Sequence, residues 1–311
     1  MHLKLSNGRD EECHDRGTTP DDLQPNRGSR AQDRGLLHRL LGGHVPRTVG
    51  PEVLHERFAA HLYPFTRRVI TINNVDDKPD VFRMADAAVA RGDCDEYVVV
   101  ADALPRALEI CGLQLRDIGR VLPFTNFLLV TVATASAEYV LHVAGDVYLD
   151  RPFAWVDGGV AKLRDNPHYF TMAPDLADYP GFAERTAERF DDPYWVNRSF
   201  SDQCFLGATK SFAAPIYSQW HPASNRYPMT NVGRIFEARV DAHMQNHDLL
   251  RLTDSRITYH HQSHTTQGST YVKPYLWQRA AISMRYRVPW LGRKATAPLR
   301  RKQRGEHPVV R

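Results

Sequence analysis

Residues 138–150 read EYVLHVAGDVYLD, and this stretch decides the fold class that the sequence predicts. Its first six residues form an almost continuously apolar run of strand length that leads into Gly145 and Asp146. Two other runs have the same character, RVITIN at 68–73 and EYVVVA at 96–101. Short, apolar, β-branched runs of this kind are typical of strands that are buried on both faces of a sheet.

Helical patterns separate these runs. In the helix expected over 79–91, Val81, Met84 and Ala85 share one face, and Gly92 follows as a stop signal. The alternation of strands and helices predicts an α/β fold, with a mostly parallel central sheet and helices on both of its faces. The other elements expected are helices at 52–62, within 114–135, over 153–166 and over 232–246, and strands at 168–173, 202–209 and 257–260.

Composition divides the chain of 311 residues into three parts. A hydrophobic content of 42% and a charged content of 24% exclude collagen-like, wholly disordered and disulfide-scaffold classes. Residues 1–45 lack apolar periodicity and are expected to be disordered. Residues 50–278 are expected to form one domain, followed by a basic tail at 279–311.

The basic tail carries the strongest charge asymmetry of the chain. Its ten lysines and arginines stand against one acid, Glu306, whereas the remainder has 30 basic and 35 acidic residues. A solvated, partly disordered tail and a tether to anionic lipid both fit this charge, since clustered cations near a membrane contribute roughly 1 kcal/mol each. No nucleic-acid binding is expected, because no recognised module accompanies the charge.

Cysteine usage and hydropathy predict a cytoplasmic protein. The four cysteines, at positions 13, 94, 111 and 204, are too sparse for a disulfide framework and contain no CxxC pair. The N-terminus is polar, which is not typical of a secretory signal, and no run approaches the roughly 20 apolar residues of a spanning helix. Through the basic tail, a peripheral position at the inner face of a membrane is the second option.

Acidic side chains follow each of the three apolar runs. Asp76 comes after the first, together with the polar Asn74, Asp102 comes after the second, and Asp146 and Asp150 come after the third. A single acid at such a place is usually a helix cap or a turn residue. Acids at three successive strand ends indicate a ligand site, because ligands bind beyond the carboxyl ends of parallel strands. Carboxylates there can hold Mg²⁺ or Mn²⁺, which can bridge a diphosphate.

Several common enzyme motifs are absent from the sequence. There is no GxGxxG after the first run, no GxxxxGK[ST] and no GxSxG. Dinucleotide binding by a Gly-rich turn therefore loses its main support, and a P-loop NTPase and the common hydrolase elbow are excluded.

Two segments resemble nucleotide-sugar-dependent glycosyltransferases of the A-type (GT-A) fold, near family 2. VVVADAL at 98–104 resembles their second acidic element, and HVAGDVYL at 142–149 resembles their DxD element, with Ala144 in place of the first acid. The resemblance spans about 65–265. It implies a Rossmann-like nucleotide-binding half at 65–175, an acceptor half at 176–278 and, at the diphosphate, Asp146.

The resemblance also implies nucleotide contacts and metal ligands. Asn74 or Asp76 and Asp102 would contact the nucleotide. Since one DxD acid is missing, His260 or His261 would complete the site for Mn²⁺ or Mg²⁺. The two histidines point in opposite directions on a strand, so only one of them would face the site.

Two carboxylates are candidates for the catalytic base. SDQCFL at 201–206 is similar to the DQ-containing strand of several sugar transferases, where the acid lies near a sugar. An inverting transferase needs a carboxylate to take the proton of the acceptor hydroxyl. Asp202 and Glu237 both have the required chemistry, and the sequence does not rank them. On the expected helix, Glu237 and Asp241 are four residues apart and share a face.

These expectations favour a glycosyltransferase that uses a nucleotide-sugar donor and a glycan, lipid-linked or small-molecule acceptor. The first alternative is a sugar-phosphate nucleotidyltransferase, against which the acidic, glycine-free loop at 73–77 argues. The second is a non-catalytic nucleotide- or glycan-binding protein on a transferase scaffold, motivated by the missing DxD acid.

Overall fold

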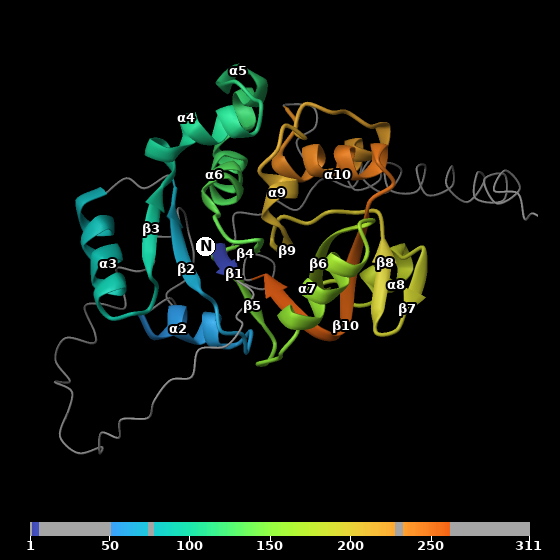
Figure 1. The fold of residues 1–311 in the computed structure, drawn as a ribbon, viewed down its shortest axis with the longest axis horizontal. Helices are drawn as coiled ribbons and strands as arrows, with labels where there is room; N and C mark the ends of the chain where they lie inside the picture. The colour runs from blue at the N-terminus through green and yellow to red at the C-terminus, as the bar shows by residue number, and fades with distance from the viewer. Residues whose placement is uncertain (1, 6–50, 74–77, 228–232, 262–311) are drawn as a thin grey trace, which may run out of the picture.

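Ten strands form one mixed sheet in the computed structural model, which describes residues 2–5, 51–73, 78–227 and 233–261 (Figure 1). The strands are β1 (His2–Leu5), β2 (Arg67–Ile72), β3 (Glu96–Val99), β4 (Tyr139–Val143), β5 (Val147–Leu149), β6 (Tyr169–Leu176), β7 (Arg189–Asp191), β8 (Tyr194–Asn197), β9 (Cys204–Ala208) and β10 (Leu250–His261). The α-helices are α2 (Pro51–Ala59), α3 (Lys78–Ala90), α4 (Val100–Ile110), α5 (Leu115–Ile118), α6 (Asn126–Thr134), α7 (Val156–Asp165), α8 (Phe182–Thr186), α9 (Thr209–Phe212) and α10 (Phe236–Asn246). Two 3₁₀ helices are η1 (Gly119–Phe124) and η2 (Pro222–Arg226).

The sheet is mixed and its pairings are mostly antiparallel. Its order is β3-β2-β1-β4-β9-β6-β10-β8-β7, and β5 also pairs with β10. Among the described pairs, only β2–β3 and β6–β10 are parallel, and the other seven are antiparallel. The prediction of a mostly parallel central sheet with a Rossmann-like half is therefore wrong.

Two inserted strands explain the error. Followed from pair to pair, β2, β3, β4, β6, β7 and β10 run in one direction, and β1, β5, β8 and β9 run in the other. The strands that the sequence predicted in the first half do share a direction. However, β1 lies between β2 and β4, and β9 lies between β4 and β6. Residues 2–5 form β1, although they fall in the segment that was expected to be disordered.

Most elements lie where periodicity predicted them, but the 11-residue helix α4 was missed, and the strand expected at 96–101 ends at Val99, where α4 follows. The strand expected at 257–260 is the end of the longer β10, and the helix expected within 114–135 divides into α5, η1 and α6. The sequence did not predict β5 or the β7–β8 hairpin. Figure 1 places β2, β3 and α3 at one end of the sheet and β7, β8 and α8 at the other.

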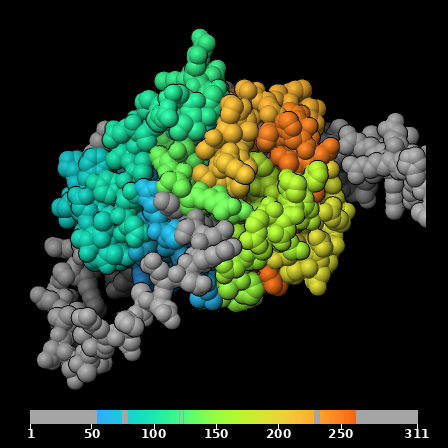
Figure 2. Space-filling view, viewed as in Figure 1, coloured from blue at the N-terminus to red at the C-terminus, as the bar shows by residue number. Residues whose placement is uncertain are grey.

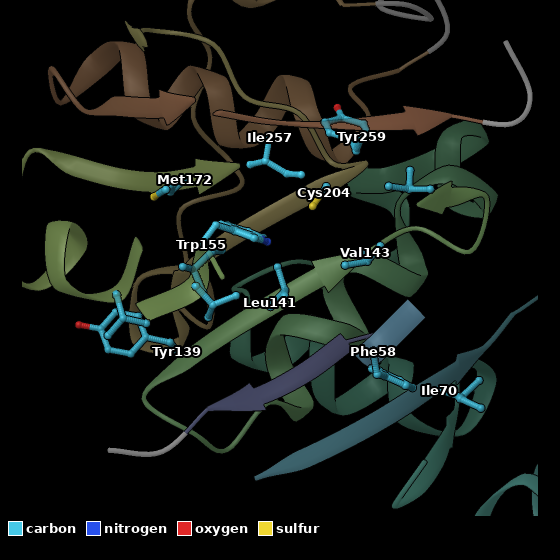
Figure 3. Close-up of a cluster of buried hydrophobic side chains, with 14 of the residues drawn as sticks. Phe58, Ile70, Tyr139, Leu141, Val143, Trp155, Met172, Cys204, Ile257 and Tyr259 are labelled. Atoms are coloured by element: carbon cyan, nitrogen blue, oxygen red, sulfur yellow. The ribbon is translucent and has the colours of Figure 1, made fainter. Parts of the chain in front are cut away.

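Two hydrophobic clusters pack against the sheet. The first gathers apolar residues of α2, α3 and α7 with strand residues such as Leu141, Cys204 and Tyr259 (Figure 3). The second gathers residues of α4, α6, α9 and α10 around Phe205 and Phe236. Cys204 and Phe205 alternate between the clusters, as neighbouring residues of a strand must. In the space-filling view, segments before and after β4 meet without a visible break (Figure 2).

The direction of three strands brings distant segments to one sheet edge. Because β4 and β10 run together and β9 runs against them, the end of β4, the start of β9 and the end of β10 lie at the same edge. This edge carries the site described below. No helix in the described residues is long and apolar enough to cross a membrane.

Candidate functional site

A tight turn between β4 and β5 positions Asp146. The amide of Ala144 donates to the Gln203 carbonyl at 2.8 Å, and the amide of Val147 donates back to the Ala144 carbonyl at 3.0 Å. Val147 stands opposite His261 in the β5–β10 pairing. As a result, Asp146 Oδ2 lies 3.0 Å from His261 Nε2.

Asp146 is held in its ionised form by its neighbours. Burial by itself would raise the pKa of this carboxyl, but the hydrogen bond from His261 and the positive charge of Arg57 outweigh burial and lower the pKa below its ordinary 3.8. Arg57, on α2, donates a hydrogen bond to the carbonyl of Gly145. The turn therefore presents a stable negative charge beside a histidine.

Asp202 and Glu237 form a second acidic pair at the same edge. Asp202 lies two residues before β9, and Glu237 lies in the first turn of α10. The Asp202 amide donates to Glu237 Oε1 at 3.1 Å, and the two carboxyl groups hydrogen-bond each other. Two carboxyl groups can form such a bond only when one of them carries a proton, so the pair shares a proton.

The two members of this pair differ in their pKa. Burial raises the pKa of Asp202 from 3.8 to about 6. Burial, and then the charge of Asp202, raise the pKa of Glu237 well above its ordinary 4.5, although Arg251 opposes this. The shared proton therefore belongs mainly to Glu237, and Asp202 is the member that ionises near neutral pH.

The two pairs act on one another electrostatically. The electrostatic effect of His261 lowers the pKa of Asp202, and the negative charge of Asp146 raises it. Tyr259, two residues before His261, donates to the side-chain oxygen of Gln203 at 3.1 Å. The edge thus combines a carboxylate–histidine pair and a proton-sharing carboxyl pair in one cluster.

His260 points away from this cluster. Its Nδ1 lies 3.7 Å from an Asp178 oxygen, and its ring stacks on Tyr148 with centroids 5.2 Å apart. Asp178 also accepts the backbone N–H of His261 at 2.9 Å. Of the two histidines considered as metal ligands, only His261 contacts Asp146.

Of the predicted nucleotide contacts, Asp146 is part of this cluster, and Asp102 is the only other one that the structure describes. Asn74 and Asp76 lie outside the described residues. Asp102 lies in the first turn of α4, where it is exposed, and no hydrogen bond or ion pair ties its side chain to another described residue. Asn73, directly after β2, exchanges side-chain hydrogen bonds with Asn126 at 3.1 Å.

Sequence reasoning missed two buried polar residues on α2 and in the turn after it. Arg57 is 9% exposed and His61 is 2% exposed, and both line a cavity of about 630 Å³ between this segment and β4–β5. The signal was present, since Leu54, Arg57, Phe58 and His61 follow the spacing of a buried helix face. Polar residues at positions of an apolar stripe are candidates for a site.

Few side chains at this edge of the sheet could bind a metal ion. In the part of the chain that the structure describes, no group of three or more His, Cys, Asp or Glu residues is arranged to hold a metal ion. Asp146 and His261 offer one oxygen and one nitrogen. Comparisons with protein-family models, with curated proteins and with solved structures gave no significant match.

Proposed function

We propose that this chain is a glycosyltransferase, which moves a sugar from a nucleotide-sugar donor to an acceptor hydroxyl with the assistance of Mn²⁺ or Mg²⁺. The observation that supports this best is the adjacency of two chemically different pairs at one sheet edge. Asp146 with His261 suits a cation that would neutralise the diphosphate of a donor, and Asp202 with Glu237 suits proton removal. The sequence resemblance around Asp102 and Asp146 supports the same function.

Asp202 is the proposed base, and Glu237 is the residue that positions it. A carboxylate with a pKa of about 6 is ionised at neutral pH and is a stronger base than an ordinary aspartate. In the proposed step, the acceptor hydroxyl gives its proton to Asp202 while its oxygen bonds to the anomeric carbon. The bond between that carbon and the diphosphate oxygen breaks, and its electron pair leaves with the nucleoside diphosphate.

The residues present are compatible with a divalent cation. A carboxylate oxygen and an imidazole nitrogen suit Mn²⁺ better than Mg²⁺, which prefers oxygen alone. Asp146 and His261, whose side chains lie 3.0 Å apart, are the residues that would hold the ion. When bound, the ion would stabilise the charge of the leaving diphosphate.

The remaining parts of the proposal concern partners and location. Asn74, Asp76 and Asp102 are proposed as nucleotide contacts, and the acceptor as a glycan, a lipid-linked molecule or a small molecule. We also propose a cytoplasmic location, with contact between the basic tail at 279–311 and the inner face of a membrane.

Calorimetric binding of UDP, GDP, dTDP and CDP, each with Mn²⁺, Mg²⁺ or a chelator, tests the proposal. We expect one nucleotide to bind, and Asp146→Asn to weaken its binding at least tenfold. Asp150→Asn is the matched control, because Asp150 is an exposed acid four residues further along the same segment. Unchanged binding in Asp146→Asn would contradict the role of Asp146, and no binding of any nucleotide would contradict the proposal.

Product analysis separates the alternatives. Release of a nucleoside diphosphate from the nucleotide sugar supports a transferase. Release of pyrophosphate from a nucleoside triphosphate and a sugar phosphate indicates a nucleotidyltransferase. Binding with no turnover indicates the non-catalytic binding protein.

A further inference from the structure

The cavity beside α2 has mostly apolar walls. Its volume, about 630 Å³, lies within the range of small-molecule sites. Charged residues of its lining, Glu56, Asp150 and Arg151, are exposed and therefore lie at its rim. Its apolar walls include Ala60, Val143, Val147 and Leu149, and the exposed Leu62 and Pro152 lie at its rim.

Arg57, which lines this cavity, has a guanidinium group whose hydrogen-bond donors are not all satisfied. Its guanidinium donates to the Gly145 carbonyl, but its Nε is buried and has no hydrogen-bond partner among the described residues. Burial lowers the pKa of Arg57, and the charge of Asp146 opposes that effect. A buried charged group with an unpaired donor is unfavourable, so a ligand that accepts from the Arg57 guanidinium has an energetic advantage.

His61 brings a second donor whose tautomer is fixed. Its Nδ1 accepts a hydrogen bond from Trp155 Nε1 at 3.0 Å. An indole nitrogen can only donate, so the proton of the neutral imidazole lies on Nε2. Burial lowers the pKa of His61 to about 4, which keeps the ring neutral at pH 7. No other described residue forms a hydrogen bond with this ring, so its Nε2–H is available to a ligand.

Arg57 and His61 are four residues apart and line the same cavity, so their donors can serve one ligand group. We propose that this cavity binds an amphiphilic anion, an apolar body that carries one carboxylate or phosphate group. The anionic oxygens would accept from the Arg57 guanidinium and from His61 Nε2, and the apolar body would lie against the aliphatic walls.

The walls exclude two other ligand classes. A sugar would bury several hydroxyl groups against aliphatic side chains that cannot bond them, at a cost for each group. Inorganic phosphate would leave most of the apolar volume without contacts. The inference does not depend on the proposed glycosyl transfer, because none of its steps uses Asp202 or Glu237.

Calorimetry on the full chain tests this site with four probes below their micelle concentrations: octyl phosphate, octanoate, 1-octanol and inorganic phosphate. We expect at least one of the two anionic amphiphiles to bind at least tenfold more tightly than octanol and inorganic phosphate. The comparison between octyl phosphate and octanoate distinguishes a phosphate from a carboxylate ligand.

Two variants act on different parts of the site. Arg57→Met removes the donors but keeps an apolar stem, and Ala60→Phe fills the cavity from a half-buried position without removing a donor. Each is expected to weaken binding at least tenfold, whereas His55→Gln, at an exposed position of the same helix outside the cavity lining, is expected to leave it unchanged. If Arg57→Met does not fold, Ala60→Phe decides alone.

Two results would overturn the inference. One is that neither anionic amphiphile binds the wild type, and the other is that binding survives both Arg57→Met and Ala60→Phe. Asp146→Asn is expected to weaken nucleotide binding but not octyl phosphate binding. Failure of the proposed function and failure of this site are therefore distinguishable.

Discussion

Two carboxyl groups one turn apart on α10 have opposite surroundings. Asp241 is fully buried and has a complete set of partners: an ion pair with Arg226, a hydrogen bond from Ser224 Oγ at 2.6 Å and one from Gln245 at 3.3 Å. Glu237 instead faces another acid, Asp202, with which it shares a proton. One helix thus carries a carboxylate that stabilises the fold and a carboxyl that is available for chemistry.

The difference lies in the partners rather than in the helix. A buried carboxylate paired with arginine and hydroxyl donors is satisfied, and removal of either side leaves a charge without its partner. A buried carboxyl beside a second carboxyl becomes neutral by taking a proton, and the other acid then becomes a base with a raised pKa. The same distinction predicts which substitutions affect activity and which affect stability.

The largest effect is expected for Asp202→Asn. If Asp202 is the base, the substitution should lower kcat/KM for sugar transfer roughly 10²–10⁴-fold, because an amide cannot accept the proton. The melting temperature should not fall, since one of two facing acids is removed. Release of nucleoside diphosphate measures the rate, and Asp150→Asn is the control. A transfer rate close to the wild-type rate would remove Asp202 from the mechanism.

A loss of stability is expected for Asp241→Asn. The change leaves Arg226, whose side chain is 8% exposed, without its counter-charge. Breaking a buried ion pair in this way costs about 3–5 kcal/mol of the free energy of unfolding, which urea denaturation measures. Glu237→Gln, one turn away, is the matched substitution and should cost far less. Equal losses in both variants would show that the two sites do not differ as described.

A smaller loss is expected for Ser224→Ala. The hydroxyl of Ser224 donates to Asp241, and a hydrogen bond to a charged group contributes about 1.5 kcal/mol. Asp241 keeps its ion pair with Arg226, so the loss should stay well below that of Asp241→Asn. Urea denaturation of the single and double variants measures the coupling. A loss equal to that of Asp241→Asn would contradict this ranking.

The sequence predicted where the strands lie along the chain better than which strands lie side by side in the sheet. Apolar runs and helical periodicity located β2, β3, β4 and β6, because such patterns report which residues are buried. They do not report which strand lies beside which. The insertion of β1 and β9 depends on long-range pairing, so the mostly parallel sheet could not be tested within any one segment.

The candidate site was only partly predictable for the same reason. Asp146, Asp202, Glu237 and His261 were identified by residue type, and the shared strand direction explains why they meet at one edge. Which acid holds the proton depends on burial and on the facing charge, which sequence spacing does not contain. Arg57 was overlooked because arginine at an apolar helical position is usually an exposed side chain with a buried stem.

The smallest expected effect is on the pH dependence of stability, and it reports on the pair of Asp202 and Glu237. Burial raises the pKa of Asp202 to about 6 and that of Glu237 above 4.5, so the folded chain binds these protons more tightly than the unfolded chain. By linkage, this pair makes the free energy of unfolding fall as pH rises from about 4 through about 6.

Other groups change the stability with pH in the opposite direction. The last test therefore compares the wild type with a variant instead of using the wild type alone. His61 and His243 have pKa values lowered to about 4, and their contribution makes stability rise with pH between about 4 and 6.5. They are present in the wild type and in Glu237→Gln alike, and their effect cancels in the difference. From pH 5 to pH 7.5, the melting temperature should therefore fall more, or rise less, in the wild type than in Glu237→Gln. An identical change in both proteins would mean that Glu237 does not hold the shared proton.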